Sequence, residues 1–152
     1  KNGVYAPYKD GFAFMFRLAN KLNHQLQNAE MRLIASVIVD ADGNPVRQYF
    51  ELELERKEII FFATSWTIVH PINDKSPFYN MSKDEFDLAE PEFMLQLKVY
   101  DQSYSQDTFT NTSYRKEEII WNAKFDNILM SNNNLNYVDF EKFNETVPIM
   151  QN

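Results

Sequence analysis

Residue types that commonly carry out catalysis are scarce in this chain. It holds only two histidines, His24 and His70, and they lie far apart in the sequence. Cysteine is absent, which excludes thiol catalysis and cysteine-ligated zinc. A glycine-rich phosphate loop, a Gly-x-Ser-x-Gly elbow and a His-Glu-x-x-His zinc motif are absent as well. The sequence therefore offers little support for an enzyme, and we expect no metal site.

His70 lies in an apolar segment directly before Pro71. A single histidine in such a place is more often a core residue than a ligand or a catalytic base. We therefore expect its ring to be buried and to hydrogen-bond a nearby loop, as buried polar groups usually do.

Carboxylates are abundant, and one group of them has a regular spacing. Glu51, Glu53 and Glu55 alternate with leucines, so a strand here has one acidic and one apolar face. By itself this pattern indicates a solvated sheet face. The formal net charge of −7 repels phosphate backbones, so we expect no nucleic-acid partner.

The elements that must position these residues are mostly short strands. Aromatic residues make up 15% of the 152 residues, and they favour pleated, half-buried surfaces. Turn chemistry at residues 40–45 predicts a hairpin over residues 30–55. Apolar alternation and short apolar runs predict strands at 12–18, 26–40, 46–55, 59–62, 66–70, 93–99, 119–125 and 137–143. We interpret residues 1–152 as a single all-β domain with a sandwich architecture.

One short helix and one polar loop interrupt this succession of strands. Ser82 and Glu85 have the spacing of a capping box, and Pro91 ends the predicted helix after about Leu88. Residues 102–107 are polar and are predicted to form a loop. The segment 59–62 is apolar and is predicted to be a buried strand.

Two further features concern the setting of the chain. It contains no run of about 18 apolar residues, so nothing in it is expected to span a bilayer. It opens at Lys1 rather than methionine, so we expect a piece of a longer protein. Composition alone is also typical of a stand-alone β-sandwich that binds a carbohydrate or a protein ligand.

The segment 64–79 carries a specific resemblance. It reads Thr-Ser-Trp-Thr-Ile-Val-His-Pro-Ile-Asn-Asp-Lys-Ser-Pro-Phe-Tyr and resembles part of the cytoplasmic C-terminal domain of inward-rectifier potassium channels, most of all the bacterial ones. Segments 15–20, 112–125 and 137–148 resemble further parts of that domain, in the same order. The resemblance covers about residues 8–148.

This resemblance implies an immunoglobulin-like sandwich and a role in ion transport. It implies a homotetramer that extends the ion pathway on the cytoplasmic side of a bacterial inner membrane. It also implies gating through a hinge to the protein's own transmembrane pore domain. Potassium ions would permeate and no cofactor is expected. Four copies have a formal charge of −28, four times −7, and such acidity raises the local cation concentration.

The resemblance also places candidate site residues. It implies that Glu58 is a pathway-facing acid and that Asn28 and Asp107 share that role or position. It aligns the stretch from residue 102 to residue 109 with a gating constriction, of which we single out Gln102, Ser103, Tyr104, Ser105 and Gln106. It places three cations near segments that face lipid headgroups in animal members, namely Arg17, Lys21 and Arg115.

Several positions depart from the family pattern. Asn28 stands where strongly rectifying members have Glu, so we expect weak polyamine block. Leu22, Asn23 and Asn111 stand where animal members have basic residues, so phosphoinositide activation is not expected. At two positions where the family usually has glycine, this chain has Asn122 and Val99. Asn tolerates positive φ, whereas Val does not.

Overall fold

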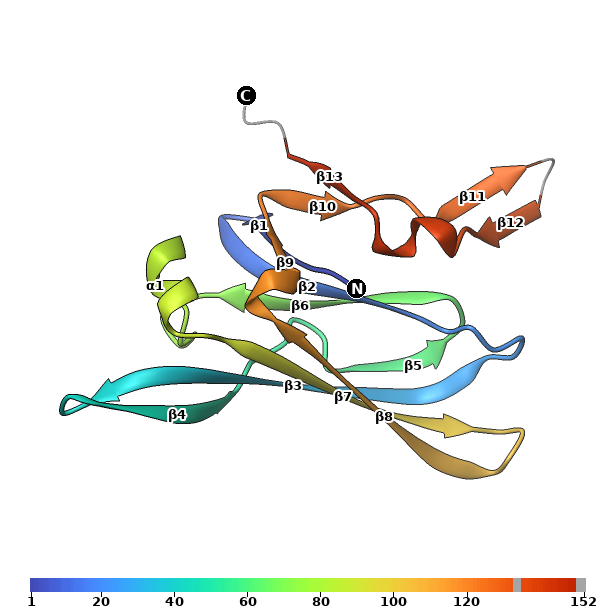
Figure 1. Ribbon diagram of the computed structural model, residues 1–152. Helices are drawn as coiled ribbons and strands as arrows, with labels where there is room; N and C mark the ends of the chain where they lie inside the picture. The colour runs from blue at the N-terminus through green and yellow to red at the C-terminus, as the bar shows by residue number, and fades with distance from the viewer. Residues whose placement is uncertain (133–134, 150–152) are drawn as a thin grey trace.

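The computed structural model describes residues 1–132 and 135–149. Within these residues, two β-sheets pack face to face, and one short α-helix lies at one end of the sandwich (Figure 1). Two small hairpin-like sheets from the C-terminal part lie beside the first sheet. The predicted all-β sandwich with one short helix is therefore confirmed.

The first sheet has the strand order β6-β2-β1-β9. The β1–β2 and β2–β6 pairs are antiparallel, whereas β9 joins β1 in parallel. The alternation that predicted a strand from Phe12 is realised in β2, where Phe14 and Phe16 are fully buried on one face. The strands are β1 (Gly3–Tyr8), β2 (Gly11–Ala19), β6 (Ser65–Ile72) and β9 (Ile119–Trp121).

The second sheet is organised around the long strand β3 (Leu26–Ala41). One edge of β3 pairs with β7. The other edge pairs with β5 near the start of β3 and with β4 near its end. The turn to β4 has positive φ at both Asp42 (54°) and Gly43 (80°), as a two-residue type I′ hairpin requires. The remaining strands are β4 (Asn44–Glu51), β5 (Glu58–Phe62), β7 (Glu92–Asp101) and β8 (Gln106–Arg115).

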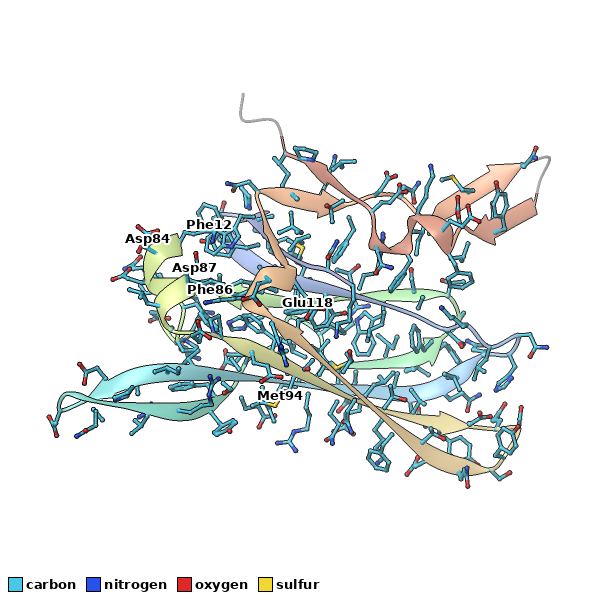
Figure 2. The ribbon with its side chains drawn as sticks, viewed as in Figure 1. Phe12, Asp84, Phe86, Asp87, Met94 and Glu118 are labelled. Carbon is cyan, nitrogen blue, oxygen red and sulfur yellow. The ribbon has the colours of Figure 1, made fainter. Side chains whose placement is uncertain are left out.

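Aromatic side chains fill the space between the two sheets. The ring centroids of Phe14 and Phe93 are 4.8 Å apart, so the two sheets touch directly through fully buried rings. Burying one such side chain stabilises the fold by roughly 1.5–3 kcal/mol. Phe86 of α1 (Lys83–Leu88) points between the sheets, whereas Asp84 and Asp87 lie on its outer side (Figure 2).

The predicted capping box forms at the start of α1. Ser82 Oγ accepts a hydrogen bond from Glu85 N at 3.2 Å, and a Glu85 carboxylate oxygen accepts one from Ser82 N at 2.7 Å. Together these bonds satisfy backbone donors that a helix N-terminus otherwise leaves unpaired. This helix is short, and its apolar anchor Phe86 is what attaches it to the core.

Two strands of the two main sheets were not recognised from the sequence. Strand β1 contains Gly3 and Pro7, two residue types that are depleted in strands, but its backbone pairs with β2 and β9. The first part of β8 was predicted to be a loop because it is polar and, as the structure shows, exposed. Its backbone nevertheless pairs with β7 from Asp101↔Gln106 to Glu92↔Arg115, and this ladder forms the strand.

Other element boundaries also differ from the prediction. The strand predicted at 119–125 is divided into β9 and β10 (Ala123–Phe125) by Asn122, whose φ is 53°. Strand β4 ends at Glu51 rather than at residue 55. Strand β5 is not a buried strand: among residues 1–132 and 135–149 it pairs with β3 alone, and it leaves Ile60 and Phe61 exposed.

The C-terminal part is more broken than the predicted strand at 137–143. That strand ends at Val138, and a 3-10 helix, η2, follows it. The elements here are η1 (Lys116–Glu118), β11 (Leu129–Asn132), β12 (Leu135–Val138), η2 (Glu141–Asn144) and β13 (Thr146–Pro148). The pairs β10–β13 and β11–β12 are antiparallel.

Candidate functional site

A hollow of about 450 Å³ lies at the end of the second sheet where β3 begins and β7 ends. Asn28 of β3, Glu58 of β5 and Asp107 of β8 all line it. These are the three residues for which the resemblance implied a pathway-facing position. The fold therefore brings together three side chains that are up to 79 residues apart in the chain (107 minus 28).

The strand registers explain why these residues meet. Glu58 pairs directly with Glu30 across β5 and β3, and Glu30 pairs with Lys98 across β3 and β7. Residues paired across a ladder share one face of the sheet, so these three form a row. This face is the outer one, because Met94, four residues before Lys98 on β7, points away from the other sheet (Figure 2).

Asn28 occupies a bulge in β3. The pairing of β3 with β7 shifts by one residue between Gln27 and Glu30, and Asn28 has a φ of 47°. Asn is among the few non-glycine residues that adopt this left-handed conformation readily. The bulge bends the strand and directs the exposed Asn28 toward the hollow, as bulges near functional sites often do.

The charges around the hollow are mixed. Glu30, Glu58 and Asp107 supply three carboxylates, and Lys98 supplies one ammonium group, which leaves a formal charge of −2. Lys98 Nζ lies 3.6 Å from Asp107 Oδ2. Carboxylates around a water-filled depression attract cations and repel anions, so this surface suits a cation pathway better than an anion site.

Sequence reasoning missed Glu30 and Lys98. Both carry a signal that strand periodicity could have revealed. Glu30 comes two residues after Asn28 in the same strand, and Lys98 alternates with the apolar Leu97 and Val99 of β7. Their position opposite one another depends on strand register, however, and the sequence does not state which strands are neighbours.

The stretch predicted to form the constriction is a tight turn followed by a strand. Residues 102–105 form the exposed β7–β8 turn, and Gln106 already belongs to β8, because its backbone pairs with Asp101. This corrects the loop assignment of Gln106 and of the residues to Phe109. The buried Asp101 accepts a bond from Ser103 N at 2.9 Å, which holds the turn.

The three cations expected to face lipid do not form a common surface. Arg17 is only 6% exposed, and its guanidinium donates hydrogen bonds to the backbone carbonyls of Asp126, Lys142 and Phe143. It also lies over the ring of Phe125, at 4.7 Å from the centroid. In this structure the Nη1 and Nη2 donors of Arg17 bind the C-terminal segment rather than facing solvent, and a lipid role for Arg17 stays a prediction.

The other two cations are exposed but distant from each other. Lys21 follows β2, next to the point where β3 begins, and lies over Phe140. The position of Arg115 can be expressed along β3, because Arg115 pairs with Glu92 and Glu92 pairs with Ser36. Ser36 is nine residues along β3 from Gln27, which lies at the end of β3 nearer to Lys21 (36 minus 27). At about 3.3 Å per residue, nine residues correspond to roughly 30 Å. A lipid role for Lys21 or Arg115 stays a prediction.

His70 is a satisfied core histidine, as predicted. It is 2% exposed, with Nδ1 2.7 Å from the Glu53 carbonyl and Nε2 2.8 Å from Ser76 Oγ. A carbonyl can only accept, so Nδ1 carries the proton and Nε2 accepts from the serine hydroxyl. Burial lowers the pKa of His70, although the Glu53 carbonyl partly opposes that shift.

The alternating glutamates are paired rather than free. Glu51 binds Arg32 at 3.0 Å, Glu53 lies 3.7 Å from Lys75, and Glu55 binds both Lys9 and Tyr8. The bond to Arg32 lowers the pKa of Glu51, and the bond to Lys9 lowers that of Glu55. Because β4 ends at Glu51, Glu53 and Glu55 lie outside the strand; the three glutamates are solvent-exposed, as predicted, but they do not form one face of a sheet.

The described part of the chain has neither a membrane-spanning helix nor a metal-binding cluster. No helix within residues 1–132 and 135–149 is long and apolar enough to cross a bilayer. Across the same described ranges, no cluster of three or more histidine or carboxylate side chains has the arrangement of a metal site.

Comparison with known proteins is consistent across the whole chain. The family model for the inward rectifier potassium channel C-terminal domain matches residues 1–152. Inward rectifier potassium channel Kirbac3.1 of Paramagnetospirillum magnetotacticum is 27% identical over 80% of this chain and 42% of its own length. ATP-sensitive inward rectifier potassium channel 12 of Gallus gallus is 24% identical over 97% of this chain and 36% of its own length.

The matches cover most of this chain but less than half of each relative. The chain spans only about two fifths of the length of these curated relatives. Among solved structures, the sporulation control protein Spo0M of Bacillus subtilis matches 78% of this chain and 44% of its own, at 13% identity and a TM-score of 0.31. A similarity this low supports no conclusion about function.

Proposed function

This chain belongs to the inward rectifier potassium channel C-terminal domain family, and we propose that it forms the cytoplasmic part of a tetrameric potassium channel. In this role it continues the ion pathway beyond a transmembrane pore domain and transmits gating movements to it. The domain lies on the cytoplasmic side of a bacterial inner membrane, carries no cofactor and is not an enzyme.

The hollow that Asn28, Glu58 and Asp107 line is the observation that carries this proposal. These residues come from different strands, and the register brings them to one face at one end of the sandwich. A fourfold arrangement with this face toward the axis produces a ring of carboxylates around a water-filled vestibule. Such a ring concentrates potassium ions near the pore entrance.

The β7–β8 turn is the proposed constriction. Residues 102–105 protrude beyond the hollow and are exposed, so they are free to meet their symmetry mates near the axis. His24 Nε2 lies 3.1 Å from Asp101 Oδ1 at the base of this turn. A movement of the β2–β3 loop is thereby transmitted to the turn.

The test uses the channel that contains this chain, reconstituted in planar bilayers at low salt. Glu58→Gln lowers the inward single-channel potassium current, because it removes one vestibule carboxylate per subunit. Glu53→Gln is the matched control, because it removes another exposed carboxylate, one that pairs with Lys75 outside the hollow. Native mass spectrometry of the same channel gives a tetramer.

Two results contradict the proposal. If the current is the same in the unmodified channel and in both variants, Glu58→Gln and Glu53→Gln, the hollow does not line the vestibule. An assembly without fourfold stoichiometry removes the ring.

The single change Asn28→Asp adds an acid at the bulge and increases voltage-dependent block by spermine, because a carboxylate holds polyvalent cations and an amide does not.

A further inference from the structure

We propose that Lys98 is a built-in counter-cation of the hollow, and that it lowers the affinity of the hollow for polyvalent cations such as polyamines. This inference rests on the proposed function for its effect on the ion pathway. Its local part, the effect of Lys98 on cation binding to the chain, stands on the geometry of the hollow alone.

Lys98 lies at one end of the charged row across the second sheet, between Glu30 on β3 and the strand β8 that carries Asp107. It is paired directly with Glu30, and Glu58 lies on the other side of Glu30. Neighbouring strands are about 4.8 Å apart, so Glu58 and Lys98 lie on strands about 10 Å apart. Asp107 pairs with Tyr100, two residues after Lys98 on the same face, which makes it the diagonal neighbour of Lys98.

The row also explains why a cation is favoured at this position. Glu30 and Glu58 are like charges directly opposite one another, an arrangement that destabilises a sheet. An ammonium group on the other neighbour of Glu30 offsets this repulsion. Its 3.6 Å contact with Asp107 places the same charge close to a third carboxylate.

The Lys98 ammonium group is partly exposed, which suits a counter-cation of the hollow better than a structural anchor of the fold. The Lys98 side chain is 41% exposed and that of Asp107 is 51% exposed. Exposed pairs of this kind contribute little to stability, typically below about 1 kcal/mol. Removing the Lys98 charge therefore changes the electrostatics of the hollow while leaving the fold intact.

The effect is selective for ions of high valence. Lys98 reduces the formal charge of the hollow from −3 to −2 per chain, and the Coulomb energy scales with the charge of the bound ion. A tetravalent polyamine therefore loses about four times as much attraction as a potassium ion. In this chain Lys98 and the neutral Asn28 act in the same direction, against polyamine binding.

The first experiment titrates spermine into the 152-residue chain at low salt, followed by amide NMR of the residues around the hollow. Lys98→Met binds spermine about three- to tenfold more tightly than the unmodified chain, with shifts at Glu30, Glu58 and Asp107. Lys75→Met is the matched control, because it breaks a similar exposed pair with Glu53 at 3.7 Å, outside the hollow. Equal affinity of Lys98→Met and Lys75→Met overturns the proposal.

The second experiment measures spermine block in the reconstituted channel. Lys98→Met increases block, and Lys98→Met with Asn28→Asp increases it further, whereas Lys75→Met leaves it unchanged. If Lys98→Met strengthens spermine binding to the chain but not channel block, the local role of Lys98 holds and the proposed pathway-facing position of the hollow fails. If it strengthens neither, the counter-cation role itself is wrong.

Discussion

His24 Nε2 lies 3.1 Å from Oδ1 of the buried Asp101, and this contact joins the β2–β3 loop to the base of the β7–β8 turn. The same carboxylate oxygen also accepts the bond from Ser103 N. Two segments that are 77 residues apart in sequence thus share one carboxylate. The turn beyond Asp101 is exposed.

We expect His24→Ala to loosen this turn. The variant removes one partner of Asp101, so hydrogen exchange at residues 102–105 becomes faster, and stability falls by about 1 kcal/mol. Gln25→Ala is the control, because it is an exposed neighbour in the same loop. Hydrogen–deuterium exchange and urea denaturation measure both effects. Unchanged exchange in His24→Ala shows that the contact does not hold the turn.

Arg17→Met is expected to detach the C-terminal segment from β2. It leaves the carbonyls of Asp126, Lys142 and Phe143 without their donor, at a cost of about 3 kcal/mol. Arg17→Lys recovers little, since one ammonium group does not reproduce the planar guanidinium. Urea denaturation gives the loss of stability, and hydrogen exchange over residues 123–149 locates it.

The matched control for that experiment is Lys21→Met. Lys21 also lies over an aromatic ring, that of Phe140, at 5.9 Å from the centroid, but it is exposed. We expect a change in stability below about 0.5 kcal/mol, as for most surface substitutions. Equal losses in Arg17→Met and Lys21→Met contradict a clamping role for Arg17.

The buried His70 predicts how stability depends on pH. Burial lowers the pKa of His70 in the folded state below its ordinary value near 6.5, so below that pH the unfolded chain binds more protons than the folded one. Stability therefore falls as the pH decreases through about 6.5 toward the folded pKa. Above pH 6.5 both states are neutral at this site and the contribution is constant.

The measurement is a series of urea unfolding curves between pH 5.5 and 7.5. Carboxylates stay ionised in this window, so they add little to the slope. His70→Gln removes the part of the slope that His70 supplies, although its overall stability is lower. A slope identical to that of the unmodified chain shows that His70 is not the group responsible.

Gly3 and Gly11 are predicted to respond differently to the same substitution. A Cβ added at Gly3 lies 2.6 Å from Cε1 of the fully buried Phe16, so Gly3→Ala overpacks the core and costs about 1–3 kcal/mol. At Gly11 the nearest atom is the Ile72 carbonyl oxygen, at 3.9 Å. Gly11→Ala therefore changes the unfolding midpoint little, and an equal loss in both variants excludes the clash as the cause.

Much of the architecture could be predicted from local patterns. The alternation around Phe14 and Phe16, the turn at Asp42 and Gly43, and the capping box at Ser82 are local signals, and each forms as expected. The elements that were not predicted lack such local signals. Strand β8 is exposed over most of its length, so its polar sequence resembles a loop, and only pairing with β7 makes it a strand.

The candidate site was predictable in part. The sequence motifs pointed to Glu58, Asn28 and Asp107, and the structure places all three around one hollow. The same motifs pointed to Arg17 as a lipid contact, whereas the structure shows it buried and bonded to backbone carbonyls. Its role is decided by the C-terminal segment, more than 100 residues away, whose carbonyls surround the guanidinium.

What the sequence by itself determined is the class of the fold, the family and the presence of an unusual excess of acid. Periodicity, turn chemistry and ordered motifs are properties of neighbouring residues, so they can be read before folding. What only the tertiary structure decided is which charges meet. Lys98 faces Glu30 because the bulge at Asn28 sets the register of β3 against β7, and a register shifted by one residue would turn the lysine's partner to the other face.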